Sequence, residues 1–148
     1  MEQIQIQKKR APTMAAQTAK AIRKELKEQF PNTKFSVKTR NFSGGNAVDV
    51  DWIDGQTSDE VDAVVKKYQY GNFNGMIDMY EYNNQDESIP QVMFVQVQRK
   101  ISDETMEKVR LEISKDYGID LQMNQWYSQF NTYGNDFLWR EVHKKSFL

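Results

Sequence analysis

The chain of 148 residues is 39% hydrophobic and 28% charged, and it contains no cysteine. Such a composition is typical of a folded domain with a substantial core. It excludes disulfides, thiolate metal ligands and cysteine nucleophiles. No apolar run approaches the roughly 20 residues of a membrane helix, and the first ten residues lack the apolar segment of a secretory signal. We therefore expect a single cytoplasmic domain over residues 1–148, with no membrane contact.

The net charge of −1 conceals two oppositely charged parts. Residues 1–40 hold ten Lys and Arg against three acidic residues, whereas residues 41–148 hold ten against eighteen. A basic first part is suited to an anionic partner such as nucleic acid. The alternative is that the two parts neutralise each other within the fold.

A first helix is expected after Thr13, a candidate N-cap, and it should end at Pro31. Residues 1–12 before it are consistent with either an edge strand or a mobile arm. The apolar residues of the helix recur at helical spacing, at Ala15, Ala19, Ile22, Leu26 and Phe30. A basic stripe follows a neighbouring face, at Lys20, Arg23, Lys24 and Lys27. This stripe is either solvated surface or an anion-binding face for a nucleic-acid backbone or an acidic protein.

Residues 34–42 and 47–53 alternate apolar and polar side chains, which predicts the two strands of a hairpin. If the loop is Ser43–Asn46, the register places Arg40 opposite Asp49 and Lys38 opposite Asp51. The same register pairs apolar or uncharged groups on the other face, Val37 with Trp52 and Thr39 with Val50. Matching pairs on both faces favour this hairpin.

Two chemical interpretations of this hairpin compete with a structural one. Gly44-Gly45 lies between strands, whereas a phosphate-binding glycine loop follows a strand and opens a helix, so a turn is favoured. Asp49, Asp51 and Asp54 could bind Mg²⁺ or Mn²⁺, but pairing with Lys38 and Arg40 explains the first two. We therefore assign no metal, no cofactor and no catalytic residue. The single histidine, His143, is expected at the surface or in packing.

The remaining pattern predicts two further helices and two further strands. Thr57 and Glu60 form a candidate capping box before a helix that buries Val61, Val64, Val65 and Tyr68. Phe73-Asn74-Gly75 is expected to be a turn, with strands over 76–82 and 91–99. Ser102 should cap a third helix that ends at Gly118.

The last segment, residues 121–148, is rich in aromatic residues and has no clear periodicity. It is expected to form a short helix and then a strand, or two irregular packing segments. Its aromatic side chains suit a core or a protein interface. The order α-β-β-α-β-β-α before this segment predicts an α+β fold, a mostly antiparallel sheet with helices packed on one face.

A series of motifs runs through residues 15–82: Phe30-Pro31 with Lys34–Val37, then Phe42–Gly45, then Val48, Val50 and Trp52 with Asp54-Gly55, then Phe73, Gly75, Met76 and Asp78. With these motifs the chain resembles the large polyvalent-protein-associated domains, small α+β domains of phage and conjugative-element polypeptides. The resemblance implies an accessory protein of a phage, plasmid or integrative element. It transfers no catalytic residue, and the size and charge asymmetry would suit an anti-CRISPR protein.

The leading hypothesis is a non-enzymatic binding protein that inhibits or modulates a host nucleic-acid-directed defence. Its partner would be a host protein or ribonucleoprotein such as a CRISPR effector. The contact would be the basic stripe or an acidic surface running from hairpin to helix, formed by Asp49, Asp51, Asp59, Glu60 and Asp62. The alternatives are a direct DNA- or RNA-binding factor for element transfer or replication, and a metal-dependent nuclease using Asp49, Asp51 and Asp54.

Overall fold

The structure, a computed structural model, describes residues 11–147, so the expected arm or strand over residues 1–10 lies outside it. The helices are α1 (Met14–Gln29), α2 (Ser58–Val65), α3 (Asp103–Tyr117) and α4 (Gly134–His143), with the 3-10 helix η1 (Lys66–Tyr68) directly after α2. The strands are β1 (Ser36–Phe42), β2 (Gly45–Ile53), β3 (Asn72–Asn74), β4 (Met79–Glu81), β5 (Phe94–Lys100), β6 (Trp126–Tyr127) and β7 (Thr132–Tyr133).

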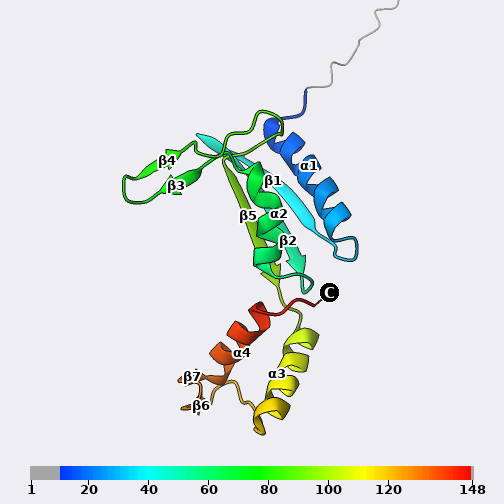
Figure 1. Cartoon of the computed structure of the whole chain (residues 1–148), viewed down its shortest axis with the longest axis vertical. Coiled ribbons are helices and arrows are strands. Elements are labelled where there is room, and N and C mark those ends of the chain that lie inside the picture. The colour runs from blue at the N-terminus through cyan, green and yellow to red at the C-terminus, as the bar shows by residue number, and fades with distance from the viewer. Residues whose placement is uncertain (1–10, 148) are drawn as a thin grey trace, which may run out of the picture.

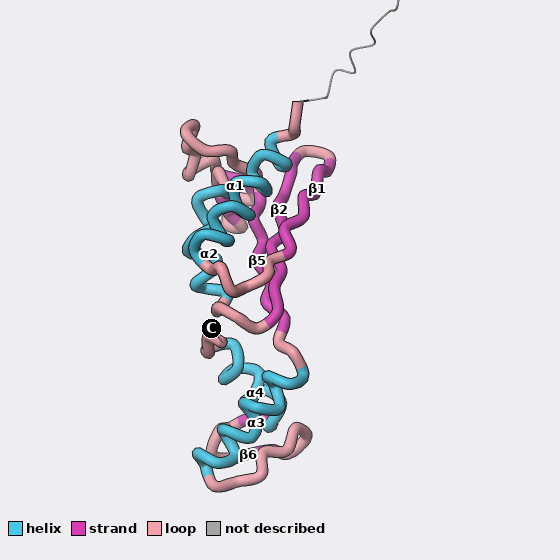
Figure 2. The backbone as a smooth tube through the Cα atoms, turned by 90° about the vertical axis from the view of Figure 1, so that its right-hand side faces the viewer, coloured by secondary structure: helices cyan, strands magenta, loops and turns pink. Residues whose placement is uncertain are grey.

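The central sheet has the strand order β1-β2-β5, and α1 and α2 cover one of its faces (Figure 2). The predicted α+β class is confirmed, and α1 and α2 lie on one face as expected, whereas the third helix, α3, packs with α4 in a second cluster. The sheet is mixed, however, because β5 runs parallel to β2 while β1 runs antiparallel to it. A parallel neighbour needs a crossover connection, and α2 lies within that connection. The apolar face of the sheet and the two helices enclose a core that includes Ile22, Leu26, Val48, Val50, Trp52, Val61 and Val65.

The β1–β2 register differs from the predicted one by two residues. Lys38 is paired with Asp49 and Val37 with Val50, and the loop contains only Ser43 and Gly44. Gly45 is the first residue of β2 and pairs with Phe42. A Cβ there would lie 2.6 Å from the Met93 sulfur and 2.7 Å from the Phe42 ring, so these side chains would have to move. A shift of two preserves the faces, so the apolar side of each strand is the one predicted.

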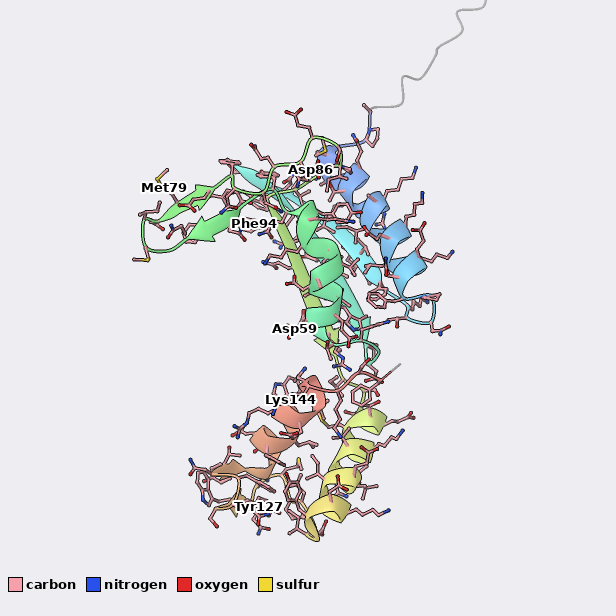
Figure 3. The ribbon with its side chains drawn as sticks, viewed as in Figure 1. Asp59, Met79, Asp86, Phe94, Tyr127 and Lys144 are labelled. Carbon is pink, nitrogen blue, oxygen red and sulfur yellow. The ribbon has the colours of Figure 1, made fainter. Side chains whose placement is uncertain are left out.

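A second hairpin, β3–β4, projects away from the sheet (Figure 1). The predicted turn at Phe73-Asn74-Gly75 is wrong for its first two residues, which belong to strand β3, whereas Gly75 lies in the turn that follows. The strand expected over 76–82 is only Met79–Glu81 and joins β3 rather than the central sheet. Figure 3 shows Met79 out on this hairpin, away from Phe94 at the start of β5.

The C-terminal third forms a second hydrophobic cluster, built by α3, α4 and the short β6–β7 hairpin. Its buried members are Val109, Ile113, Leu121, Tyr127, Leu138 and Val142. The predicted order of a short helix and then a strand is wrong, because here the hairpin precedes the helix. The aromatic residues divide between the core and the surface. Tyr127 is buried, whereas Trp126, Tyr133 and Trp139 are each about half exposed.

The predicted helix caps are confirmed by hydrogen bonds. Thr13 accepts from the Ala16 amide at 3.1 Å, Thr57 from the Glu60 amide at 3.2 Å, and Ser102 from the Thr105 amide at 3.3 Å. Gly118 ends α3 with φ of +64°, as a C′ glycine does. Local capping signals therefore fixed the starts of these three helices.

Asp54 connects the end of β2, in the first part of the fold, to the start of α3, in the second. This residue follows β2, and its carboxylate accepts hydrogen bonds from the Ser102 amide at 2.9 Å, the Ser102 hydroxyl at 2.7 Å and the Thr105 hydroxyl at 2.9 Å. Burial raises the pKa of the Asp54 carboxyl, but these hydrogen bonds and the charge of Arg99 outweigh burial, so the pKa lies below its usual value. The carboxylate thus stabilises the N-terminus of α3 as an anion.

We expect the variant Asp54→Asn to lose about 1–2 kcal/mol of folding stability at pH 7, since a charged acceptor is removed. Asn tolerates the positive φ of 56° at this position. Because the folded pKa is depressed, the contribution is present above the unfolded pKa of about 3.9 and is lost as pH falls through the folded value. Urea unfolding at pH 7 and at about pH 3 should therefore show the difference shrinking. A difference that is constant with pH would contradict this assignment, and Asp62→Asn, on the exposed side of α2, is the control.

Candidate functional site

The basic stripe predicted on the first helix lies on the solvent side of α1. All four of its residues, Lys20, Arg23, Lys24 and Lys27, are exposed. Arg23 donates a hydrogen bond of 2.7 Å to the Val37 carbonyl, so it links α1 to the edge strand β1. Within residues 11–147, none of the three lysines has a carboxylate within 4.0 Å. They form an exposed cationic row held on a rigid helix, which we call the α1 lysine row.

The acidic surface predicted to run from the hairpin to the helix is not a single surface in the structure. Asp49 and Asp51 alternate with Val48, Val50 and Trp52 along β2, so they face away from α1 and α2. The other three, Asp59, Glu60 and Asp62, are exposed on α2, on the opposite side of the sheet. Figure 3 shows Asp59 at the N-terminal end of α2. Asp59 and Glu60 lie in the first turn, where acidic side chains stabilise a helix.

The uncovered face of the sheet has its own charge arrangement. Arg40 donates to both carboxylate oxygens of Asp49, at 2.5 and 3.0 Å, and also to Gln96 at 3.3 Å. This is the predicted Arg40–Asp49 pair, reached diagonally in the observed register rather than directly across. The predicted pair of Lys38 with Asp51 is not formed within 4.0 Å, in residues 11–147. Asp51 lies on the same face, diagonally across from Lys38 of β1 and from Lys100 of β5.

The three aspartates proposed for a metal are used in different ways. Asp49 pairs with Arg40, and Asp54 accepts from Ser102 and Thr105 near α3. Within the part of the chain that the structure describes, no group of three or more His, Asp or Glu residues is placed to hold a metal ion. The geometry therefore gives a nuclease mechanism no metal centre among these residues.

His143 is half-buried near the C-terminus of α4, with its ring 4.2 Å from that of Trp139. Burial, together with the charge of Arg99, lowers the pKa of this imidazole. Its surroundings are apolar and cationic, which agrees with the packing role expected from the sequence.

Sequence reasoning missed a hollow at the end of the uncovered face. It has a volume of about 750 Å³ and lies where β1, β2 and β5 meet the segment before α2 and the C-terminal residues. Lys34, Lys38 and Lys100 line it, with Asp51 beside them. We call it the lysine cleft. In the sequence, Lys100 directly follows the strand predicted over 91–99, but only the parallel pairing of β5 brings it to β2.

A family model, Large polyvalent protein associated domain 29, matches residues 13–118 of the chain. The chain belongs to this family. The match begins at Thr13, the N-cap of α1, and ends at Gly118, the C-cap of α3. It is longer than the range 15–82 that carried the sequence resemblance. Comparisons with curated proteins and with solved structures gave no match.

Membership in the Large polyvalent protein associated domain 29 family associates this protein with phages and other mobile genetic elements. The matched region contains the whole central sheet, α1 and α2, and also α3 of the second cluster. The α1 lysine row and most of the lysine cleft therefore belong to the family domain. Among residues 11–147, no helix is both long enough and apolar enough to cross a membrane.

Proposed function

We propose that this protein is a non-enzymatic binding protein of a phage or mobile element that contacts nucleic acid through the α1 lysine row. The nucleic acid is either free or part of a host ribonucleoprotein such as a CRISPR effector. In the second case the protein inhibits or modulates a host defence system. The observation that carries the proposal is the row itself, which consists of Lys20, Lys24 and Lys27 with no acidic neighbour within 4.0 Å in residues 11–147.

The α1 lysine row is suited to binding a phosphate backbone. The acidic residues are less suited to the alternative, in which the protein imitates nucleic acid. Exposed lysines without partners release counterions from a polyanion on binding, which gives affinity without sequence readout. In contrast, the acidic residues are split between two sides of the sheet, and Asp49 is neutralised by Arg40. A split acidic surface cannot present the continuous charge of a nucleic-acid strand.

The test is a mobility-shift titration with duplex and single-stranded DNA and RNA across a range of salt concentrations. Lys20→Gln/Lys24→Gln/Lys27→Gln should weaken binding for all sequences and reduce the salt slope by about 3, because each phosphate contact contributes about 0.9. Arg23 is kept, since it holds the Val37 carbonyl. The matched control, Lys108→Gln/Lys115→Gln/Lys144→Gln, removes three exposed lysines of α3 and the end of α4 and should bind as the natural protein does.

Failure to bind any nucleic acid at low salt would overturn direct contact through the row. Including Mg²⁺ in parallel samples tests the nuclease alternative, for which shortened substrate is the required result. The defence setting needs a separate assay, in which the protein is expressed in a host with an active CRISPR system and plasmid survival is counted. Survival that rises with the natural protein and the control variant but not with the row variant supports inhibition through α1.

A further inference from the structure

We infer that the lysine cleft is a binding site for a nucleotide, with the phosphate on the lysines and the base against the apolar wall. The site lies at the end of the sheet where β1 begins, and no residue of the α1 lysine row lines it, so it goes beyond the proposed function. The nucleotide has two possible sources, a free mononucleotide or the terminal nucleotide of a strand. Both present the same phosphate, sugar and base.

The size of the cleft fits such a ligand. Its volume of about 750 Å³ lies within the range of about 300–1,000 Å³ that small-molecule sites occupy. It also lies where separate parts of the chain converge: β1 and the segment before it, β2, β5 and Phe147 near the C-terminus. The bridge of Phe147 to Gly55, with a hydrogen bond of 2.7 Å from its amide, holds that last wall in place.

The charges of the cleft favour an anion. Lys34, Lys38 and Lys100 come from three different places in the chain, and within residues 11–147 none has a carboxylate within 4.0 Å. Of the two carboxylates on the wall, Asp54 is turned to Ser102 and Thr105. Three lysines and one carboxylate that is not held by hydrogen bonds to Ser102 and Thr105, Asp51, therefore line the cleft. Lysine is a common ligand for phosphate, as a point charge with three donors.

The rest of the wall suits the base. Phe35 and Phe147 are half-buried, and Ile53 is 62% exposed although it is a large apolar residue. Trp52 lies buried beneath, with its ring 5.6 Å from that of Phe35, so the wall is rigid. An aromatic base that covers Ile53 would remove this apolar surface from water. Stacking of a base on such side chains is favourable whatever the base.

Asp51 gives the site a preference among bases. A carboxylate accepts hydrogen bonds and donates none when ionised, so it favours a base that carries an exocyclic amino group. Ser36 and Gln98 pair with Asp51 from the two neighbouring strands and line the same cleft, which adds uncharged polar groups beside it. Cytosine, with its amino group, should therefore bind better than uracil, which has a carbonyl in that place.

The test is calorimetric titration with CMP, UMP and inorganic phosphate, and with a short oligocytidylate that carries a 5′-phosphate or a 5′-hydroxyl. We expect CMP to bind at least about tenfold more tightly than UMP, a difference that one hydrogen bond to a charged group supplies. Asp51→Asn should remove the difference. Lys38→Gln/Lys100→Gln should weaken CMP at least about tenfold, whereas Lys108→Gln/Lys115→Gln should not.

The outcomes are separable. Tighter binding of CMP than of the 5′-phosphorylated strand identifies the free nucleotide as the source, and tighter binding of that strand than of CMP and of the 5′-hydroxyl strand identifies the strand terminus. Inorganic phosphate binding as tightly as CMP would overturn the site, because the base would then contribute nothing. So would the absence of binding by any probe, or an unchanged affinity in Lys38→Gln/Lys100→Gln. The variant Lys20→Gln/Lys24→Gln/Lys27→Gln should bind CMP normally, so failure of the α1 proposal and failure of this one are distinguishable.

Discussion

Replacing Arg99 with Ala is expected to lower the free energy of unfolding by about 3 kcal/mol or more. The residue is only 6% exposed, and its guanidinium donates to the Asp54 carbonyl at 2.8 Å, the Gly55 carbonyl at 2.9 Å and the Lys145 carbonyl at 2.8 Å. Truncation removes this donor from the Asp54 and Lys145 carbonyls, at a cost of about 1–3 kcal/mol for each one that water cannot reach, while the Gly55 carbonyl keeps the Phe147 amide. It also removes the guanidinium from the ring of Phe147, 4.9 Å away.

The effect should also appear in the shape of the unfolding curve. Arg99 is part of β5 in the first cluster, and through Lys145 it holds the segment that follows α4 of the second. If residues 1–148 form one domain, as the sequence predicts, the natural protein unfolds in one transition. In Arg99→Ala, α3 and α4 are expected to unfold at lower urea than the sheet.

Urea unfolding followed by circular dichroism and by tryptophan fluorescence measures both effects. Trp52 reports the first cluster, since it is buried there, and Trp126 and Trp139 report the C-terminal part. Arg99→Lys should recover less than half of the loss, because one ammonium group cannot reach three carbonyls as a guanidinium does. The neighbouring exposed residue gives the control, Lys100→Ala, which should change stability by about 0.5 kcal/mol or less. Equal stability of Arg99→Ala and this control would disprove the role.

The elements that the sequence predicted correctly are those fixed by local physics. Thr13, Thr57 and Ser102 each satisfy an amide a few residues away in the chain, and the apolar positions of the helices repeat within one turn. The alternation of Val48 and Val50 with Asp49 likewise depends on β2 alone. Such signals need no knowledge of the rest of the fold.

The features that the sequence did not reveal depend on contacts between distant residues. The register is an exception, because it was wrong for a local reason: the loop holds two residues, Ser43 and Gly44, rather than four, and both loop lengths leave the same side chains on each face. Arg99 was assigned only to a strand, since its three acceptors lie in other segments. The lysine cleft exists because β5 is parallel to β2, and that pairing follows from the crossover through α2. The sequence did identify the α1 lysine row, because helical spacing alone brings those residues to one face.

The variant Gly134→Ala tests the packing of the C-terminal part, because helix propensity and side-chain packing predict opposite changes in folding stability. Gly134 is the first residue of α4, and helix propensity alone predicts a gain of up to about 1 kcal/mol for Ala. Packing predicts the reverse. A Cβ at this position would lie 1.9 Å from the Gln122 carbonyl oxygen and 3.3 Å from the ring of Tyr127.

The overlap cannot be relieved by a side-chain movement, because Gln122 contributes backbone atoms. Segment 122–125 is also held against the start of α4 by hydrogen bonds of 2.9 Å from Gly134 to Gln125 and from Asn135 to Met123. We therefore expect a loss of about 3 kcal/mol or more, which is at or above the upper end of ordinary overpacking costs. Amide exchange should increase in residues 121–143 and remain slow in α1 and the sheet.

The control is Gly75→Ala, where nothing lies within 4 Å of the added Cβ, and stability should change by about 1 kcal/mol or less. A Gly134 variant as stable as this control, or more stable than the natural protein, would show that the turn before α4 is not packed as described. Only a residue without a side chain lets the chain pass the Gln122 carbonyl and start α4 directly after β7, and periodicity cannot register a contact of that kind.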